Sequence, residues 1–400
     1  MAEKSPRIVV VMGTRPEAVK LAPVVRALRD RAGAVPPIVV STGQHREMLE
    51  QVLTPLGVTP DIDLALMEPV QELSELTARV LRAMTTTLAN LKPDLVVVQG
   101  DTTTAFTTAL AAFYQRIAVG HVEAGLRSHD LEHPYPEEMN RRLASALATI
   151  HFAPTASARE NLLAEGIAPS AVCVTGNTVV DSLMRLQEIA PGLTESPVSA
   201  QLLHGRRLLL VTSHRRETWG AQLEGICWAL RTLVATFDDL LVVYPVHLNP
   251  NVAGPVHHIL GGEERIVLLP PLGYVPFVNL MRQAHFIITD SGGVQEEAPT
   301  LGKPVLVIRH VTERPEASRL GLGRVIGTDP EELVRAASEL LTDPAAYKRM
   351  SRQANPYGDG RAAGRIADAI ARWWKGDHPL LPLEREFAPV GGQRPVSGVA

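Results

Sequence analysis

Charged side chains gather where the apolar, strand-like runs of the sequence end. In the first half of the chain, Arg15, Asp101 and Glu123 each follow such a run within a few residues. Ligands of open parallel sheets bind outside the carboxyl ends of the strands, so loop residues at these positions are candidates for chemistry. A carboxylate there could also simply cap the next helix, and the position of Asp101 alone leaves both interpretations open.

The stretch 121–142 concentrates side chains that can move protons or bind anions. It lies between a strand-like and a helix-like run and contains Glu123, Arg127, His129, His133, Glu137, Glu138 and Arg141. Glu137 and Arg141 are an i,i+4 pair, so a helix would place them on one face. They could form an ordinary surface ion pair or belong to an active site, and their spacing does not decide between these.

Two further clusters, both in the second half, could hold an anion. The segment 212–217 (TSHRRE) follows a strand-like run and brings one histidine and two arginines to the start of a helix, where the helix dipole favours negative charge. The segment 290–293 reads Asp-Ser-Gly-Gly, and backbone N–H groups at such a glycine-rich helix start bind phosphate well. Glu296 and Glu297 follow one turn later and could accept hydrogen bonds from a ribose diol.

These clusters need alternating strands and helices to position them, and the sequence predicts such elements. Short β-branched runs without polar alternation are typical of parallel strands that are covered on both faces. We expect strands at 7–12, 37–41, 95–98, 117–122, 172–174, 208–212, 240–244, 266–268, 286–289 and 305–308. The segment 14–17 (TRPE) is a capping box with proline in the first turn, so a helix begins there. The predicted fold class is α/β, with two Rossmann-like domains of parallel sheet.

The domain boundaries follow from where this alternation stops. Residues 186–205 lose helical periodicity and contain two prolines, which predicts a linker between an N-terminal domain at 1–185 and a C-terminal domain at 206–361. The amphipathic stretch 362–376 predicts a helix that crosses back to the N-terminal domain. Residues 377–400 are rich in Pro, Gly and Val without periodicity, which is typical of a disordered tail.

The composition narrows the class of protein. The chain has 400 residues, of which 45% are hydrophobic and 20% charged, enough to bury two globular cores. A formal net charge of −4 lacks the broad positive field typical of nucleic-acid or anionic-membrane binding, so any anion must meet a local cluster. Cys173 and Cys227 lack metal or redox spacing, which predicts buried thiols in a reducing compartment.

Several familiar sequence signals are absent. We find no apolar signal region and no uninterrupted apolar window of roughly 18 residues, so we expect a cytoplasmic protein. A phosphate-binding G-x-x-x-x-G-K-[ST] loop, an H-E-x-x-H pair and a G-x-S-x-G elbow are also missing. The glycines near 321–323 and 358–360 lack the spacing and the preceding strand of a dinucleotide site. We therefore expect no nicotinamide cofactor and no metal.

Taken together, the candidate segments resemble the non-hydrolysing UDP-N-acetylglucosamine (UDP-GlcNAc) 2-epimerases, whose fold is the two-domain GT-B fold. The resemblance extends over residues 7–375 in family order. Its motifs are Gly13-Thr14-Arg15-Pro16-Glu17-Ala18 with Lys20, Gln44-His45-Arg46-Glu47-Met48, Gly100-Asp101-Thr102-Thr103-Thr104, His121-Val122-Glu123-Ala124-Gly125-Leu126-Arg127, Pro136-Glu137-Glu138 through Arg141, Gly176-Asn177-Thr178, His214-Arg215-Arg216-Glu217, Tyr244-Pro245-Val246-His247-Leu248-Asn249-Pro250, Asp290-Ser291-Gly292-Gly293-Val294-Gln295-Glu296-Glu297 and Thr312-Glu313-Arg314-Pro315-Glu316. The resemblance implies two sheets facing across a cleft that contains the active site.

The resemblance also implies roles for the candidate residues. The diphosphate of the substrate would be held by Arg15, His214, Ser291 and Gly292. Glu297 would bind the ribose, Phe277 would lie near the uracil, and Arg314 is a further ligand-site position. The sugar side would be lined by Lys20, Asp101, Glu123, Glu137 and Arg141.

The chemistry of this family explains why carboxylates and cations must converge. The C2 proton of UDP-GlcNAc is not next to a carbonyl, so the family removes it together with UDP from C1, which leaves a 2-acetamidoglucal. Cations stabilise the departing UDP while a base takes the proton, and re-addition with protonation on the opposite face gives UDP-N-acetylmannosamine (UDP-ManNAc). We expect Asp101, Glu123 and Glu137 to supply the acid–base steps, with His214 as a fourth catalytic residue.

Three points stay open at the level of sequence. Similar bacterial enzymes carry a second UDP-GlcNAc as an allosteric activator, and Gln44, Arg215 and His247 match that site, whereas Glu47 and Val70 depart from some relatives. A hydrolysing 2-epimerase that releases ManNAc and UDP, a GT-B glycosyltransferase or a non-catalytic nucleotide-sugar sensor would need many of the same residues. The family also implies a homodimer, which the sequence itself does not encode in any visible pattern.

Overall fold

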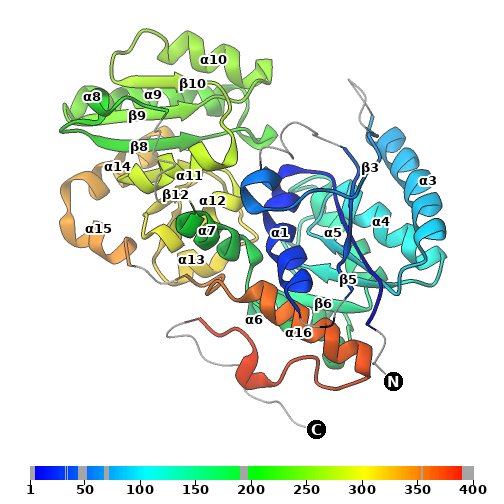
Figure 1. Cartoon of the computed structure of the whole chain (residues 1–400). Coiled ribbons are helices and arrows are strands. Elements are labelled where there is room, and N and C mark those ends of the chain that lie inside the picture. The colour runs from blue at the N-terminus through cyan, green and yellow to red at the C-terminus, as the bar shows by residue number, and fades with distance from the viewer. Residues whose placement is uncertain are drawn as a thin grey trace. The chain divides into compact units, whose positions relative to one another are not determined.

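A computed structural model of the chain describes residues 5–31, 33, 35–43, 52–66, 72–189, 197–352 and 355–389. The chain divides into two compact units (Figure 1). Unit 1 comprises Met1–Leu186 and Tyr357–Ala400, and unit 2 comprises Gln187–Pro356. Residues 357–361, expected in the second domain, belong to unit 1.

Unit 1 is built on a parallel sheet with the strand order β3-β2-β1-β4-β5-β6-β7. Its strands are β1 (Ile8–Met12), β2 (Ile38–Ser41), β3 (Ile62–Asp63), β4 (Leu95–Gln99), β5 (Ala118–Val122), β6 (Ile150–Ala153) and β7 (Val172–Val174). The central strands β1 and β4 pair in parallel and are buried along their whole length. Their continuous β-branched sequences fit this position, because helices cover both faces of such a sheet.

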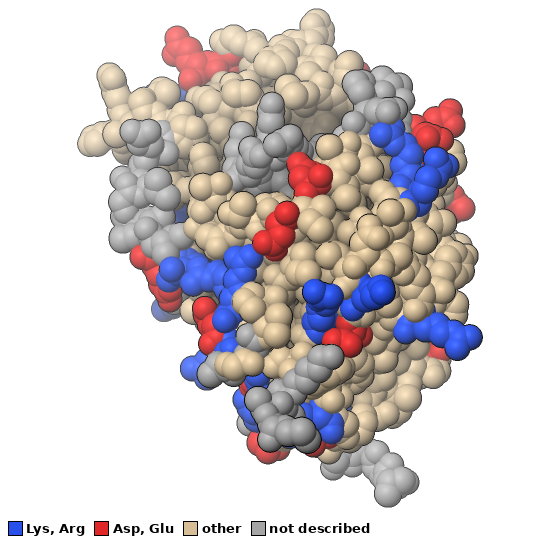
Figure 2. Space-filling model, turned by 45° about the vertical axis from the view of Figure 1, so that its right-hand side comes forward, with Lys and Arg blue, Asp and Glu red and all other residues tan. Residues whose placement is uncertain are grey.

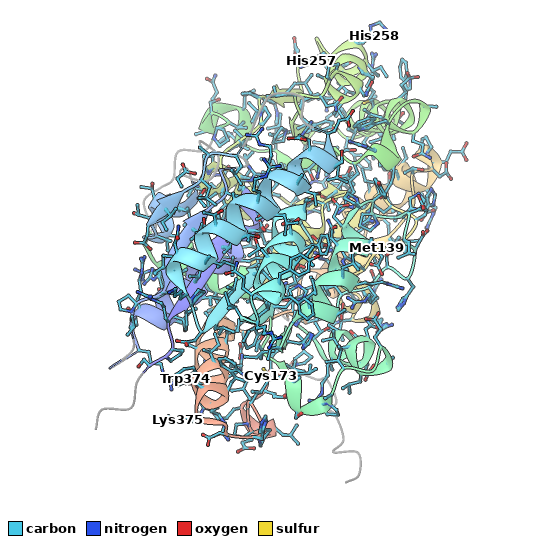
Figure 3. The ribbon with its side chains drawn as sticks, turned by 90° about the vertical axis from the view of Figure 1, so that its right-hand side faces the viewer. Met139, Cys173, His257, His258, Trp374 and Lys375 are labelled. Atoms are coloured by element: carbon cyan, nitrogen blue, oxygen red, sulfur yellow. The ribbon has the colours of Figure 1, made fainter. Side chains whose placement is uncertain are left out.

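Helices cover the sheet of unit 1 and contribute to its core. They are α1 (Arg15–Arg29), α3 (Leu73–Leu91), α4 (Thr103–Tyr114), α5 (Glu137–Leu147), α6 (Ala156–Ala164), α7 (Thr178–Ile189) and α16 (Ala362–Lys375), with short 3-10 turns η1 (Pro169–Ala171) and η4 (Leu383–Arg385). Buried Val80, Met84 and Leu88 of α3 pack with alanines of α4 on one face of the sheet. The late helix α16 lies beside α1 (Figure 1), and Trp374 and Lys375 mark its end in Figure 3.

Unit 2 repeats this architecture with the parallel strand order β10-β9-β8-β11-β12-β13. Its strands are β8 (Arg207–Thr212), β9 (Leu240–Pro245), β10 (Ile266–Leu269), β11 (Phe286–Thr289), β12 (Val305–Val307) and β13 (Gly323–Val325). Its helices are α8 (Ala200–Leu203), η2 (Arg216–Thr218), α9 (Ala221–Thr236), α10 (Pro250–Leu260), α11 (Tyr274–Gln283), α12 (Gly292–Glu297), η3 (Ala298–Leu301), α13 (Pro315–Arg319), α14 (Pro330–Thr342) and α15 (Pro344–Met350). The predicted α/β class with parallel sheets is confirmed in both units.

The segment after α16 differs from the expected disordered tail. Leu380, Leu381 and Phe387 are buried, and the N–H of Phe387 donates to the carbonyl of Val174 in β7 over 2.9 Å. The expectation of disorder is therefore wrong for residues 377–389, because a few apolar side chains and one edge strand suffice to hold the segment on unit 1. Residues 390–400 lie outside the described part of the chain. Among the described residues, none of the helices is both long and apolar enough to cross a membrane.

Candidate active site

The loop after β1 fixes Arg15 at the first position of α1. Thr14 caps this helix, and the Glu17 carboxylate accepts a 2.7 Å hydrogen bond from the N–H of Thr14, so the predicted capping box is confirmed. Gly13 lets the loop after β1 lie against the start of α4, because a Cβ at this position would lie only 2.7 Å from Oγ1 of Thr104. These contacts hold the backbone of Arg15 at the carboxyl end of β1.

Lys20 and Glu123 form a buried ion pair in unit 1. Nζ of Lys20 contacts Oε2 of Glu123, and only 7% and 5% of the two side chains are exposed. Asn177 donates from Nδ2 to the same carboxylate oxygen over 2.9 Å. Glu123 has φ 64°, a left-handed conformation that is unfavourable for a residue with a side chain and is concentrated at functional sites. The surrounding contacts therefore compensate both the buried charges and the backbone strain.

Asp101 and Arg141 form a second pair, in which the carboxylate is the more exposed member. Nη2 of Arg141 contacts Oδ2 of Asp101, and the exposed fractions of the side chains are 4% and 25%. Arg141 also donates from Nη1 to Glu138 over 3.1 Å, and Asn140 donates to the carbonyl of Asp101 over 3.0 Å. Helix α5 thus holds both the backbone and the side chain of Asp101. Glu137 is the first residue of this helix, where the helix dipole favours a carboxylate.

A buried histidine supports the turn that carries Asp101. Nε2 of His121 lies 2.8 Å from the carbonyl of Gly100, and the side chain is fully buried. Burial lowers the pKa of His121 to about 3, since an imidazolium would lose its hydration. A neutral His121 that donates from Nε2 is therefore the form that holds the Gly100–Asp101 turn.

In unit 2, Asp290 contacts the loop that carries His214. Nδ1 of His214 lies 3.1 Å from Oδ1 of Asp290, and Oδ2 accepts from the N–H groups of His214 and Arg215 over 2.7 and 2.8 Å. Burial alone would raise the pKa of Asp290, but the interactions with His214 and with these N–H groups outweigh it and lower the pKa to about 2. The ionised Asp290 therefore orients His214, whose ring also stacks on His247 with centroids 6.0 Å apart.

The glycine-rich loop after β11 lies directly against Arg314. A Cβ on Gly292 would approach Cζ of Arg314 to 2.7 Å, so only glycine lets the guanidinium lie this close to the loop. Arg314 forms ion pairs with Glu296 and Glu313. Glu296, which the sequence offered as a ribose ligand, thus serves to hold a cation next to the expected phosphate position.

Helix α11 carries Phe277 and contacts Glu297 through Tyr274. Oε1 of Glu297 accepts a 2.6 Å hydrogen bond from the hydroxyl of Tyr274, which opens α11, and Phe277 lies one turn later on the same helix and is half-buried. Ser291 precedes α12 and makes no capping hydrogen bond through its side chain. These positions fit the expected order of base, ribose and phosphate contacts, which stays a prediction.

The expected site residues fall into two groups. Unit 1 carries Arg15, Lys20, Asp101, Glu123, Glu137 and Arg141, and unit 2 carries His214, Arg215, His247, Phe277, Ser291, Gly292, Glu297 and Arg314. Of the expected allosteric residues, Gln44 lies outside the described residues. Arg215 lies 4.0 Å from Glu217 and 3.9 Å from Glu313. Within the described part of the chain, no three His, Cys, Asp or Glu side chains converge as metal ligands do.

Sequence reasoning assigned no role to several residues that support the site. They are Asn177, Glu138, Asn140, Asp290 and Glu313. All of them lie within the motifs that carry the family resemblance, and Glu138 and Asp290 also lie in the candidate segments 121–142 and 290–293. Each of them contacts one of the candidate site residues. The motif alone does not reveal these contacts, because they depend on how the chain folds.

Two parallel α/β units with charged groups at their strand ends define the class of GT-B-like proteins. A family model described as UDP-N-acetylglucosamine 2-epimerase matches residues 26–371. Over 371 residues the chain is 51% identical to the UDP-N-acetylglucosamine 2-epimerase of Salmonella typhimurium, covering 91% of this chain and 98% of that protein.

Solved structures agree with this relationship. The UDP-GlcNAc 2-epimerase from Neisseria meningitidis bound to UDP-GlcNAc matches with a TM-score of 0.86 and 43% identity, covering 92% of this chain and 100% of that chain. The enzyme of the same name from Methanocaldococcus jannaschii, in complex with UDP-GlcNAc and UDP, matches with a TM-score of 0.79 and 32% identity, covering 91% and 99%. The chain therefore belongs to the UDP-N-acetylglucosamine 2-epimerase family and is an isomerase by class.

Proposed function

We propose that this chain interconverts UDP-GlcNAc and UDP-ManNAc by eliminating UDP and adding it back. The observation that supports this most strongly is the pair of ion-paired carboxylates in unit 1, Glu123 with Lys20 and Asp101 with Arg141. A simple nucleotide-sugar binding protein would not need buried carboxylates held next to cations at the ends of two neighbouring strands. General acid–base catalysis does need carboxylates fixed in this way.

In the proposed reaction, one carboxylate of unit 1 removes the C2 proton while the C1–O bond breaks and its electron pair leaves with UDP. The product pair is 2-acetamidoglucal and UDP. A protonated group then delivers a proton to the opposite face of C2, and the phosphate oxygen of UDP attacks C1. Asp101, Glu123 and Glu137 supply the base and the acid, and Lys20 and Arg141 compensate the charges of these carboxylates.

The residues of unit 2 bind the UDP portion in this proposal. His214, Ser291 and Gly292 contact the diphosphate together with Arg15, and Arg314 adds positive charge beside them. Glu297 accepts from the ribose hydroxyls, and Phe277 contacts the uracil. Hydrogen-bond donors aimed at the departing phosphate stabilise the negative charge that develops as the C1–O bond breaks.

Incubation with UDP-GlcNAc in D₂O, followed by NMR of the sugar, tests the proposal. We expect deuterium at C2 and accumulation of UDP-ManNAc. Free ManNAc with UDP would replace the proposal with the hydrolysing reaction. An unchanged sugar would exclude both epimerases and leave a glycosyltransferase or a nucleotide-sugar sensor.

We also infer that the chain acts as a homodimer in the cytoplasm. Apolar side chains on neighbouring helices of unit 1 support a dimer: Phe113 and Tyr114 of α4 are 56% and 64% exposed, and Met139 of α5 is 40% exposed (Figure 3). Figure 2, which brings the α3 side of Figure 1 forward, shows wide uncharged areas between small groups of charges. The buried free thiols of Cys173 and Cys227 suit a reducing compartment. Light scattering should give twice the chain mass, and Phe113→Glu with Tyr114→Glu should halve it if the end of α4 lies in the dimer interface.

A further inference from the structure

The carboxylate of Glu17 contacts two separate loops of unit 1. Its side chain is fully buried. Oε2 accepts hydrogen bonds from the N–H groups of Gly13 and Thr14 over 3.0 and 2.7 Å, and from the Thr14 hydroxyl over 2.8 Å. Oε1 accepts a 2.7 Å hydrogen bond from the hydroxyl of Thr102, which is 85 residues away in sequence.

A capping box explains only half of these contacts. It requires the bonds between Thr14 and Glu17, which close the first turn of α1. It does not require the bond to Thr102, the residue that caps α4 by accepting from the N–H of Ala105 over 3.0 Å. The bond to Thr102 therefore does not contribute to the start of α1, but connects this helix with the start of α4.

The two loops joined by Glu17 are those that carry candidate active-site residues. Thr14 directly precedes Arg15, and Thr102 directly follows Asp101. The strands β1 and β4 that end in these loops are neighbours in the sheet. One buried carboxylate thus connects the backbone next to Arg15 with the side chain next to Asp101.

Burial makes this connection rigid and sensitive to change. Burial raises the pKa of Glu17, whereas the hydrogen bonds from Thr102, Thr14 and Gly13 oppose that rise. A buried acceptor that loses a donor is left with an unsatisfied lone pair, which is more costly than the net strength of the bond. The geometry of either loop therefore depends on the bond that the other loop supplies.

We propose that Glu17 is a positioning residue that fixes Arg15 and Asp101 relative to each other through Thr102. This inference rests on the proposed function, because it assumes that Arg15 and Asp101 act in the same reaction. It assigns no contact between Glu17 and the substrate. Its effect on turnover is exerted entirely through the placement of the two loops.

Thr102→Val tests the link, because valine keeps the size of threonine and removes the hydroxyl. Thr155→Val is the matched control: Thr155 caps α6 at the end of β6 by accepting from the N–H of Ala158 over 3.2 Å, in a loop that carries none of the candidate site residues. Both variants lose one helix cap, and Thr102→Val should lower Tm further, because it also leaves the buried Oε1 of Glu17 without its donor. Hydrogen exchange at residues 13–17 should rise in Thr102→Val and stay unchanged in Thr155→Val.

Turnover separates positioning from stability. We expect kcat of Thr102→Val to fall about tenfold, since a displaced catalytic group slows the chemical step. Thr102→Ser should restore kcat, and Thr155→Val should leave it within about twofold. In the Asp101→Asn background, Thr102→Val should cause little further loss, because it acts through the group already removed.

The outcomes distinguish the two proposals. Unchanged exchange at residues 13–17 in Thr102→Val would overturn the link itself. Increased exchange with normal kcat would overturn the positioning role, as would full additivity with Asp101→Asn. Absence of any epimerase activity in the unmodified protein would overturn the proposed function, while the exchange measurement would still decide whether Glu17 joins the loops.

Discussion

Each unit contains a carboxylate that pairs with a basic side chain. The two units expose opposite members of these pairs to solvent. In unit 1 the Asp101 side chain is 25% exposed and its partner Arg141 only 4% exposed. In unit 2 the His214 side chain is 44% exposed, whereas its partner Asp290 is fully buried. The outward group is an acid in one unit and a base or cation in the other. This reversal fits a division of labour between proton transfer and anion binding.

The reversal arises in equivalent places of the same architecture. Asp101 follows β4 in unit 1, whose sheet neighbour β5 ends next to Glu123. His214 and Asp290 follow β8 and β11, which are also adjacent in their sheet. Residues that follow neighbouring parallel strands lie at the same edge of the sheet. The fold therefore places both exposed groups at strand ends, while their buried partners come from different elements: Arg141 from α5 and Asp290 from the loop after β11.

The largest effect is expected from Asp101→Asn, which removes the outward acid of unit 1. The variant should lose about 10²-fold or more in kcat, because an amide cannot transfer the proton. Steady-state kinetics with NMR of C2 deuteration measures this loss. UDP affinity, which we assign to unit 2 and Arg15, should change little.

A matched control for this prediction is Asp239→Asn. Asp239 also pairs with an arginine, Arg207 at 2.6 Å, but it lies at the amino end of the strands in unit 2. It should leave kcat near the unmodified value. Equal losses in the two variants would mean that Asp101 serves only as a structural ion pair and would remove the contrast between the units.

The next effect concerns the inward acid of unit 2. The pKa of Asp290 is lowered from 3.8 to about 2 in the folded chain, so the folded state favours the ionised form. This stability is present above the unfolded pKa of 3.8 and is lost as the pH falls toward about 2. The pKa difference corresponds to about 2 kcal/mol at neutral pH.

Asp290→Asn should therefore lower the stability of unit 2 at pH 7. The difference in stability between this variant and the unmodified protein should become smaller as the pH approaches 3. Hydrogen exchange of unit 2 amides over this pH range measures the difference. A constant difference at every pH would show that lost packing, and not the charge of Asp290, explains the variant.

The sequence predicted the elements and the loop positions of the site more completely than its pairings. The capping box at 14–17 and the strand-end acids were visible because each is a local pattern. The partner of Asp101 was not visible in the sequence, because Arg141 is 40 residues away. The local spacing suggested only Glu137 as a partner of Arg141. Asn177 reaches Glu123 across 54 residues. Such contacts depend on how strands are ordered in the sheet, which no local spacing encodes.

Missed secondary structure has a similar cause. The strand β6 (IHFA), which contains His151, was not among the predicted strands. In the fold His151 is buried, and its Nε2 lies 3.0 Å from the carbonyl of Ser145. A polar residue satisfied by a distant carbonyl is compatible with a buried strand, but a single sequence does not reveal the carbonyl.

The smallest expected effect separates two adjacent glycines in the glycine-rich segment after β11. Gly292→Ala would place a Cβ 2.7 Å from Cζ of Arg314, whereas a Cβ on Gly293 would meet only Oγ of Ser291 at 3.9 Å. Gly292→Ala must therefore displace a buried guanidinium that Glu296 and Glu313 hold, and we expect UDP affinity to fall about tenfold, or about 1.4 kcal/mol. Gly293→Ala should bind UDP normally in the same calorimetric titration. Because both changes add one methyl to the same short helix, equal affinities would mean that Arg314 does not contribute to anion binding.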